Sequence, residues 1–380
     1  MSCADFVIIG GGIAGASVAY RLAPHGSVVL LEREVQPGMH ATGRSAAFFA
    51  ESYGGPQVMP LTMASRRFFE SPPEGFSDVP LMTPRGAIYI ARADQMDSLE
   101  RMLATYNGAI GGLKRLSGHE VLAKIEILRP DYVAGGLFEP GCRDLDVAAL
   151  HQGFLRGLKA AGGELMLDAE VRELSHANGR WLVETAQGAV EGRVVVNAAG
   201  AWGDEVARMA GARPVGLVPK RRTVITFQAP PGVAHGSWPL TLDIDEQFYF
   251  KPETGRILAS PADETPVPPS DAQPEEWDIA VTVDRLQKAT TLEVPRIENK
   301  WAGLRTFAPD NVPVVGYDPD VEDFFWCCGQ GGFGIQTAPA LSQLGAYLAL
   351  DRPIPGELAE HEVRPEIYAP GRFRDEYAVA

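Results

Sequence analysis

The stretch Phe6-Val7-Ile8-Ile9-Gly10-Gly11-Gly12-Ile13-Ala14-Gly15 decides the fold. Its four leading apolar residues predict a central parallel strand that is buried on both faces. The glycine turn is followed by a helical stretch over 16–22 and by a second apolar run, 28–31, which stops at Glu32. This succession of strand, glycine turn, helix, strand and acid predicts a dinucleotide-binding unit.

The glycines and the acid each have a physical task in such a unit. Gly10 permits the sharp turn, and Gly12 lets a pyrophosphate approach the free N–H groups at the helix N-terminus. Gly15 lets the helix pack closely on the strand. Glu32 can accept hydrogen bonds from both ribose hydroxyls of an adenosine, and its charge would repel a 2′-phosphate, which disfavours NADP. The motif itself does not separate FAD from NAD.

Composition and charge narrow the class of protein. The 380 residues leave room for two domains or one large one, and 45% hydrophobic with 22% charged residues are ordinary values for a globular protein. The formal net charge of −15 disfavours nucleic acid or an anionic membrane as the main partner. The four cysteines lack zinc spacing and the seven histidines are scattered, so no metal is expected. Without a leader pattern or an apolar run of about 20 residues, we expect a cytoplasmic protein with no transmembrane segment.

Strand and helix patterns return in the middle of the chain. Asp146 can cap a helix over 147–161, with apolar residues along one face. A strand at 194–196 leads into the small residues of 197–202, and a helix is expected over 203–210. The chain therefore regains α/β character after a long interval.

A second glycine turn opens a helix near the end of the chain. A strand at 323–328 is followed by Gly329-Gln330-Gly331-Gly332-Phe333-Gly334 and by a helix from about 335 to 350. An NAD dehydrogenase usually completes its cofactor site within one continuous half of the chain. These late segments therefore favour a longer, bent ligand such as FAD.

Several stretches, taken together, resemble the D-amino-acid oxidase and glycine oxidase family of flavoproteins. They are the N-terminal glycine motif with Glu32, the Ala41-Thr42-Gly43-Arg44-Ser45-Ala46-Ala47 stretch, Asn197-Ala198-Ala199-Gly200-Ala201-Trp202, and the second glycine turn, 329–334. Within this family the chain is most similar to bacterial FAD-dependent D-amino-acid dehydrogenases of the D-arginine dehydrogenase type. Further matching stretches are Pro219-Lys220-Arg221-Arg222, Phe248-Tyr249, Trp301-Ala302-Gly303-Leu304-Arg305 and His151-Gln152-Gly153.

The resemblance implies an α/β fold, α+β overall, in which two domains are interleaved in sequence. A Rossmann-like FAD-binding domain with a parallel sheet would comprise residues 1–76, 141–212 and 301–380. A mainly antiparallel substrate-binding domain would comprise residues 77–140 and 213–300, which mix alternating strand patterns with polar turns. These latter residues include a proline-rich surface loop, 260–278, and a helix over 275–291.

The same resemblance implies FAD as the cofactor and assigns residues to it. Non-covalent attachment is expected, because Phe307-Ala308-Pro309-Asp310 lacks the cysteine through which related oxidases bind flavin. The residues assigned to FAD by the motif and the resemblance are Gly10, Gly12, Ile13, Ala14, Gly15, Glu32, Arg33, Thr42, Gly43, Arg44, Ser45, Ala46, Ala47, Val171, Ala199, Gly200, Trp202, Gly331, Gly332, Phe333, Gly334 and Ile335.

Oxidation of an amino acid by hydride transfer from Cα to flavin N5 mainly requires positioning of the substrate. A guanidinium can clamp the α-carboxylate bidentately. Arg222 and Arg305 match the carboxylate-binding positions of the family, with Tyr249 as a phenol donor and Tyr53 closing the pocket from a mobile loop. The alternative for any single arginine is a surface salt bridge, and Arg221 is a rival to Arg222.

The predicted substrate pocket departs from the D-arginine type. A buried cationic side chain would need a carboxylate opposite it, yet the corresponding strand position is Ala87. Phe48 and Ala50 occupy positions near the flavin that are polar in the relative, and Gly332 completes the predicted pocket. Glu51 is nearby and is the alternative anchor for a cationic side chain, but it alternates away from Phe48 and Ala50 if the segment is extended. We therefore expect substrates with neutral or hydrophobic side chains.

Other functions fit parts of the same pattern. A flavin oxidase for glycine, sarcosine or another secondary amine would share the carboxylate clamp, and a 2-hydroxy-acid dehydrogenase could use the same fold. A non-catalytic flavin-binding protein is disfavoured, because cofactor binding alone does not require two clamping arginines. The D-preference comes from the resemblance alone. The electron acceptor, whether oxygen, a quinone or another molecule, is left open, as are the choice between oxidase and dehydrogenase and the oligomeric state.

Overall fold

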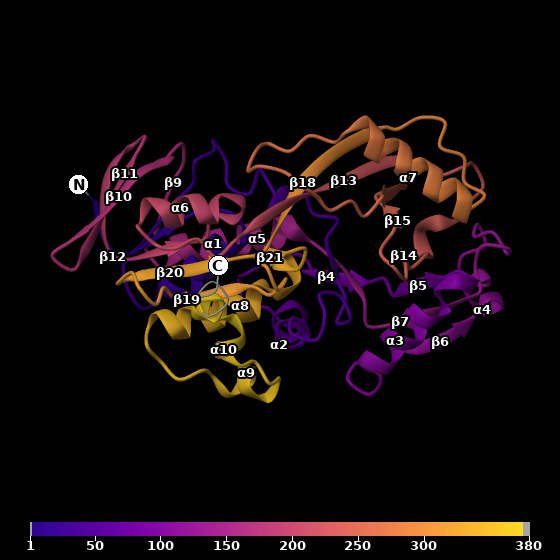
Figure 1. Ribbon diagram of the computed structural model, residues 1–380, viewed down its shortest axis with the longest axis horizontal. Helices are drawn as coiled ribbons and strands as arrows, with labels where there is room; N and C mark the ends of the chain where they lie inside the picture. The colour runs from indigo at the N-terminus through magenta and orange to yellow at the C-terminus, as the bar shows by residue number, and fades with distance from the viewer. Residues whose placement is uncertain (1, 375–380) are drawn as a thin grey trace.

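The computed structural model describes residues 2–374, which form two large sheets and one small sheet with helices packed around them (Figure 1). The first large sheet has the order β10-β11-β12-β1-β2-β9, with β20 beside β12 and β19 beside β20. Its strands are β1 (Ser2–Ile9), β2 (Val28–Leu31), β9 (Glu164–Met166), β10 (Val171–Ala177), β11 (Arg180–Thr185), β12 (Gly188–Asn197), β19 (Val314–Tyr317) and β20 (Phe324–Cys328). Strands β12, β1, β2, β9 and β20 run parallel.

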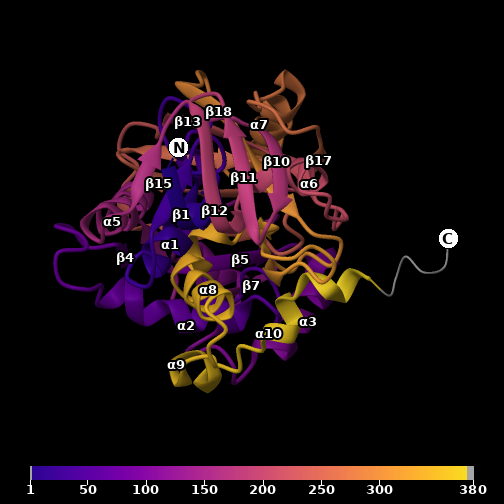
Figure 2. The same ribbon diagram turned by 90° about the vertical axis from the view of Figure 1, so that its left-hand side faces the viewer.

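The first strand is buried on both faces, as its apolar run predicts. Phe6 and Ile8 contribute to one core, which is covered by α1 (Ile13–Leu22), α5 (Val147–Ala160) and α8 (Gly334–Ala349). Val7 and Ile9 contribute to a second core on the opposite face, under the β10–β11 hairpin and α6 (Gly203–Met209). Figure 2 shows β12, β11 and β10 side by side at the end of the molecule that faces the viewer.

The second large sheet is almost entirely antiparallel. Its order is β21-β18-β13-β16-β15-β14-β5-β7-β6, with β17 beside β13, and its one parallel pair is β14 with β5 among the described residues. Its strands are β5 (Ala87–Ala91), β6 (Lys114–Ser117), β7 (Gly135–Glu139), β13 (Val218–Gln228), β14 (Leu240–Asp243), β15 (Tyr249–Glu253), β16 (Arg256–Ser260), β17 (Thr265–Pro266), β18 (Asn299–Phe307) and β21 (Gln330–Gly331). Helix α7 (Glu276–Ala289) covers one face, and the other face forms part of the pocket described below.

The remaining elements connect and flank these sheets. A small antiparallel sheet joins β3 (Phe48–Phe49), β8 (Arg143–Leu145) and β4 (Met82–Pro84). The other α-helices are α2 (Met59–Glu70), α3 (Met96–Tyr106), α4 (Gly118–Leu122), α9 (Gly356–Glu360) and α10 (Pro365–Tyr368). The 3-10 turns are η1 (Thr42–Arg44), η2 (Ala93–Gln95), η3 (Gly200–Trp202), η4 (His235–Ser237) and η5 (Pro370–Phe373).

The architecture confirms the expected fold class, and the predicted helices over 147–161, 203–210, 275–291 and 335–350 begin and end within two residues of α5, α6, α7 and α8. The predicted domain boundary at residue 301 falls inside β18, which belongs to the antiparallel sheet. Between residues 2 and 374 no helix is long and apolar enough to cross a membrane. In the same part of the chain no cluster of His, Cys, Asp and Glu side chains has the arrangement of a metal site.

Candidate active site

A pocket with a volume of about 310 Å³ is lined by residues of both large sheets. It includes the carboxyl ends of β1 and β2, the location that open α/β sheets offer to ligands. The residues assigned to FAD that lie in its wall are Gly10, Gly12, Ile13, Ala14, Glu32, Arg33, Thr42, Arg44, Ser45, Ala46, Ala47, Val171, Ala199, Gly200, Trp202, Gly331, Gly332, Gly334 and Ile335. The predicted catalytic and substrate residues in the same wall are Phe48, Tyr53, Arg222, Tyr249, Arg305 and Gly332.

The glycine turn after β1 has the geometry of an anion-binding cradle. Gly10 has a φ of +107°, and a Cβ atom there would lie 2.5 Å from the Ala198 carbonyl oxygen, so a side chain is excluded. The N–H groups of Gly12 and Ala14 have no protein acceptor among residues 2–374. The Ile13 N–H differs, because it donates to Oγ1 of Thr42 at 2.9 Å. Two unpaired N–H groups at a helix N-terminus fit a pyrophosphate.

Two glycines assigned to the cofactor shape the backbone from outside the wall. A Cβ atom on Gly15 would lie 1.8 Å from the Gly10 carbonyl oxygen, so this glycine allows α1 to pack against the turn. Gly43 donates from its N–H to the Gly38 carbonyl at 2.7 Å and closes the loop around η1. Neither residue lines the pocket.

Glu32 is almost completely buried in the wall at the adenosine end. Its carboxylate accepts hydrogen bonds from the N–H groups of Gly11 at 3.0 Å and Glu34 at 2.9 Å. Burial raises the pKa of Glu32, and the two N–H groups oppose that effect. Each oxygen keeps a free lone pair, so the group can still accept from ribose hydroxyls.

His151 also contributes to this end, although the sequence interpretation gave it no role at the cofactor. Its Nε2 lies 2.8 Å from the carbonyl oxygen of Gly11, so this nitrogen carries the proton and donates. Burial lowers the pKa of His151. The neutral imidazole therefore holds the glycine turn from α5. His151 lies on the buried face of its helix. In the sequence, this position by itself indicates packing in the core and gives no sign of a contact with the glycine turn.

Arg44 lies in the wall but directs its guanidinium into the protein. Nη1 donates to the carbonyls of Ala272 at 2.9 Å and Ala302 at 3.0 Å, and Nη2 pairs with Asp271. The proline-rich loop that carries Asp271 is thereby fixed to the loop between β2 and β3. The sequence interpretation assigned Arg44 to the cofactor and did not detect this long-range contact.

The register of β13 and β18 places the two predicted clamp arginines on one face. Arg305 is paired with Lys220, and Arg222 is two residues further along the same strand as Lys220. Because side chains alternate between faces, Arg222 and Arg305 project toward the same side, which is the pocket. Arg221 projects to the other side, where it pairs with Asp278 at 2.9 Å. The geometry therefore separates Arg222 from its rival.

The two arginines converge on one carboxylate. Oε1 of Glu264 accepts from Nη1 of Arg305 at 2.9 Å and from Nη2 of Arg222 at 3.2 Å, while Oε2 accepts from Lys220 at 2.9 Å. Burial would raise the pKa of Glu264, but the three cations outweigh it and hold that pKa below its usual value. Two positive charges are therefore held side by side at the pocket, and Nε of Arg222 is fixed further by the Asp263 carbonyl at 2.9 Å. Sequence reasoning missed Glu264, because it lies in a loop far from both arginines in the chain.

Tyr53 joins this group through its hydroxyl, which accepts a hydrogen bond from Nη2 of Arg305. Its ring centroid lies 5.0 Å from that of Phe48, and the ring of Phe48 lies 6.4 Å from that of Tyr249. Burial raises the pKa of Tyr53, so its phenol stays neutral at physiological pH. Three aromatic rings and two guanidinium groups thus enclose one end of the pocket.

Of the four residues predicted for the substrate pocket, Phe48 and Gly332 lie in its wall. Ala50 and Ala87 are completely buried and pack in the same apolar cluster as Tyr249 without reaching the wall. Strand β5, which carries Ala87, lies between β14 and β7, and the small side chain packs in a cluster with Leu137 and Leu240 of these two strands. Phe333 is also absent from the wall and packs against Tyr53.

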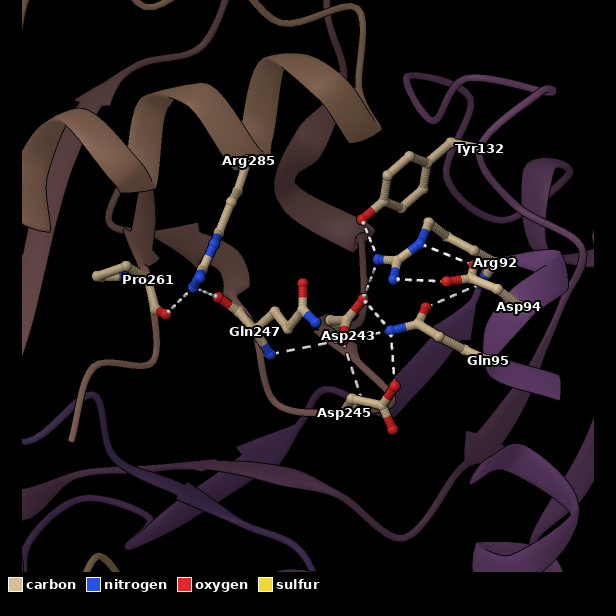
Figure 3. Close-up of polar contacts among 9 residues, drawn as sticks. All are labelled: Arg92, Asp94, Gln95, Tyr132, Asp243, Asp245, Gln247, Pro261 and Arg285. Carbon is tan, nitrogen blue, oxygen red and sulfur yellow. Dashed lines mark hydrogen bonds and ion pairs between the residues drawn. The ribbon is translucent and has the colours of Figure 1, made fainter. Parts of the chain in front are cut away.

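A carboxylate that sequence reasoning did not single out, that of Glu246, lies at the wall of the pocket and is exposed. Its backbone has a φ of +54°, in the turn 244–248 between β14 and β15. Figure 3 shows how this turn is held: Gln95 donates to the buried carboxylate of Asp243 on one side, and Arg285 donates to a carbonyl of the turn on the other. No side-chain partner neutralises Glu246 within the described residues, so the pocket has a negative charge at its edge.

The chain is similar in sequence and in fold to known FAD-dependent proteins. Residues 5–348 match the family model described as DAO: FAD dependent oxidoreductase. Mitochondrial dimethylglycine dehydrogenase of Rattus norvegicus is 28% identical over 371 residues, which cover 91% of this chain and 42% of that protein. Glycine oxidase of Bacillus licheniformis is 24% identical over 372 residues, which cover 94% and 95%. The crystal structure of glycine oxidase from Geobacillus kaustophilus has a TM-score of 0.83 at 21% identity and covers 93% of this chain and 96% of that one. The chain thus spans less than half the length of the mitochondrial dimethylglycine dehydrogenases that it matches.

Proposed function

The chain belongs to the DAO family of FAD-dependent oxidoreductases, and we propose that it oxidises the Cα–N bond of a small amino acid to an imine. The single observation that carries this proposal is the pair of guanidinium groups, Arg222 and Arg305, on one face of the β13–β18 pair at the pocket. A paired guanidinium grip suits a carboxylate, and binding of the cofactor alone does not require it.

The cofactor is FAD, and the residues present fit it. The free N–H groups of Gly12 and Ala14 would hold its pyrophosphate, and the carboxylate of Glu32 would accept from its ribose. When bound, FAD supplies the acceptor for a hydride. Attachment without a covalent bond remains our prediction.

The residues of the chain act mainly by positioning. Arg222 and Arg305 would bind the α-carboxylate, and the hydroxyls of Tyr53 and Tyr249 would donate hydrogen bonds to it. If the amine arrives neutral, loss of a hydride from Cα leaves a protonated imine, and no acid or base is needed in that step. Water then hydrolyses the imine to a 2-oxo acid and ammonia. Correct orientation of the reacting C–H can lower the activation barrier by up to about 7–11 kcal/mol, the range known for well-oriented intramolecular reactions.

We infer a D-amino acid with a neutral or hydrophobic side chain as the substrate. Phe48, Val224 and Leu242 give the wall an apolar surface next to the arginines. The exposed carboxylate of Glu246 at the wall disfavours acidic side chains. The same carboxylate offers a partner to a cationic side chain, so the inference of a neutral one rests on the apolar surface alone. The D-preference rests on the resemblance to the D-arginine dehydrogenase type.

A second candidate is an N-methylated glycine such as sarcosine or dimethylglycine. The rings of Phe48, Tyr53 and Tyr249 adjoin the arginine pair, and a group of aromatic faces can accommodate a methylated ammonium. The similarity to proteins named dimethylglycine dehydrogenase and glycine oxidase supports this candidate too. A 2-hydroxy acid would meet the same clamp but leave the aromatic group without an amine to bind.

Anaerobic reduction of the purified yellow protein tests these proposals. Bleaching of the flavin would be followed with both enantiomers of alanine, leucine, phenylalanine, methionine, arginine and lysine, and with sarcosine, dimethylglycine and lactate. We expect neutral D-amino acids or N-methylglycines to reduce the flavin fastest. A preference for arginine or lysine would contradict the apolar pocket, and reduction by none of the compounds would contradict catalysis. Peroxide formation in air would then distinguish an oxidase from a dehydrogenase.

A further inference from the structure

Glu139, at the end of β7, is a completely buried carboxylate that has no ion-pair partner among residues 2–374. Oε1 accepts a hydrogen bond from the Glu51 N–H at 2.7 Å, and Oε2 accepts one from the hydroxyl of Ser52. The Ser52 hydroxyl is also 2.7 Å from the hydroxyl of Tyr89. An uncompensated buried carboxylate is costly, so its hydrogen bonds to one short segment need a physical explanation.

That segment, 50–53, is held from its other side by Gln336 of helix α8. Oε1 of Gln336 accepts from the Ala50 N–H at 3.1 Å, and its Nε2 donates to the Tyr53 carbonyl at 3.0 Å. Gln336 is itself almost completely buried. The segment is therefore fixed between a strand of the antiparallel sheet and a helix that opens at the second glycine turn. This finding differs from the mobile loop that the resemblance implied for Tyr53.

Tyr53 is the residue through which this segment reaches the pocket. Its hydroxyl accepts from Arg305, and its N–H donates to the Ala50 carbonyl at 3.2 Å. The position of the phenol therefore depends on the conformation of 50–53, since this backbone bond closes the turn. Glu139 does not line the pocket and cannot touch a substrate there.

We propose that Glu139 is a positioning residue that holds the 50–53 segment so that Tyr53 meets the Arg305 guanidinium. The proposal rests on the proposed function, because it assigns Arg305 and Tyr53 to carboxylate binding. It goes beyond that function by placing one determinant of substrate affinity behind the wall, in a group that the substrate never contacts.

A double-mutant cycle on the holoenzyme tests the proposal. The probe is 2-aminoisobutyrate, which has an amine and a carboxylate but no Cα–H to lose, and its binding is followed by the change in flavin absorbance. Because the hydrogen bonds from Glu51 and Ser52 to a buried carboxyl group are lost, we expect Glu139→Ala to raise the Kd by about 10-fold. In a Tyr53→Phe background, which has already lost the hydroxyl contact, the same change is expected to raise the Kd by less than about twofold. An equal factor in both backgrounds would show that Glu139 does not act through Tyr53.

Two further variants keep the test decisive if Glu139→Ala folds poorly. Glu139→Gln can still accept from Glu51 and donate to Ser52, so we expect a Kd within about threefold of the natural protein. Ser52→Ala removes one contact and is expected to raise the Kd by about threefold. The matched control is Asp318→Asn, which alters another buried carboxylate, bonded to Trp326, and is expected to change stability but not the Kd.

Hydrogen exchange separates failure of this proposal from failure of the proposed function. We expect Glu139→Ala to speed amide exchange at residues 51–53, and Glu139→Gln to leave it nearly unchanged. Unchanged protection in the alanine variant would overturn the positioning role, whether or not the probe binds. If protection is lost as expected but the natural protein does not bind the probe, the positioning of the segment stands and the assigned substrate class fails.

Discussion

A Cβ atom placed on Gly332 would lie 2.0 Å from Nη2 of Arg305. The guanidinium can occupy its position because residue 332 has no side chain. We therefore expect Gly332→Ala to displace Arg305 and to lower kcat/KM by about 10-fold or more, a loss of about 1.4 kcal/mol in transition-state binding. FAD content, measured by absorbance after gel filtration, is expected to stay near that of the natural protein.

Gly356 provides the control for this substitution. An added Cβ there meets nothing within 4 Å, and its backbone does not require a positive φ. Gly356→Ala is expected to leave the kinetics unchanged. Normal kinetics in Gly332→Ala would mean that Arg305 can move without loss and does not clamp the substrate.

The arginine pair gives a second prediction. Lysine cannot reproduce a bidentate grip, so Arg305→Lys and Arg222→Lys are each expected to reduce kcat/KM by about 100-fold. The effect should be measured with the best amino acid found in the anaerobic screen.

Arg221→Lys is the matched control, since Arg221 lies next to Arg222 on the same strand but pairs with Asp278 on the opposite face. It is expected to lower the midpoint of thermal unfolding with little effect on kcat/KM. A kinetic loss in Arg221→Lys as large as in Arg222→Lys would contradict the assignment of faces.

Glu32 gives a prediction about the cofactor. Removal of its charge weakens hydrogen bonds to the ribose hydroxyls, and we expect Glu32→Gln to raise the Kd for FAD by about 10-fold, measured by titration of apoprotein. Glu170→Gln serves as the comparison, because Glu170 also lies in the wall but is exposed and pairs with Arg33 at 3.2 Å. Equal effects of the two substitutions would contradict the ribose role.

The pH dependence of stability should reveal Glu139. Burial raises its pKa above the ordinary value of 4.5, so the folded protein binds this proton more tightly than the unfolded chain does. The free energy of unfolding contributed by Glu139 should therefore be highest below pH 4.5 and fall as pH rises through the raised pKa. Glu139→Gln should lack this decline in denaturant titrations at several pH values. Parallel curves for the two proteins would contradict the raised pKa.

The sequence predicted the first sheet well because its signals are local. A buried strand, a glycine turn, a helix and Glu32 follow one another within a short stretch, and each has a physical reason that does not depend on distant residues. The helix capped by Asp146 was predicted for the same reason, and the structure confirms the cap through a bond of 2.8 Å to Ala149.

The contacts that shape the substrate end depend on register and could not be predicted in this way. Glu264 meets Arg305 from 41 positions away, and Gln336 meets Ala50 from 286 positions away. Ala87 was predicted to line the substrate pocket, but it is buried and lies outside the pocket wall. Its position in a strand indicates which face of the sheet it occupies, but not which side chains pack over that face. Arg221 and Arg222 could be separated only when the pairing of β13 with β18 was known.

The first large sheet has a consequence for handling this protein. Its parallel strands come from residues 2–31, 164–197 and 324–328, and most of the second large sheet is inserted between these stretches of chain. No single proteolytic cut could release either sheet as an intact fragment, and neither half of the gene would encode one. Pairing strands that are so far apart in the chain requires closing long loops, which costs conformational entropy, so refolding from denaturant should be slow. Partly folded chains expose apolar surface meanwhile, so the refolding yield should fall as protein concentration rises.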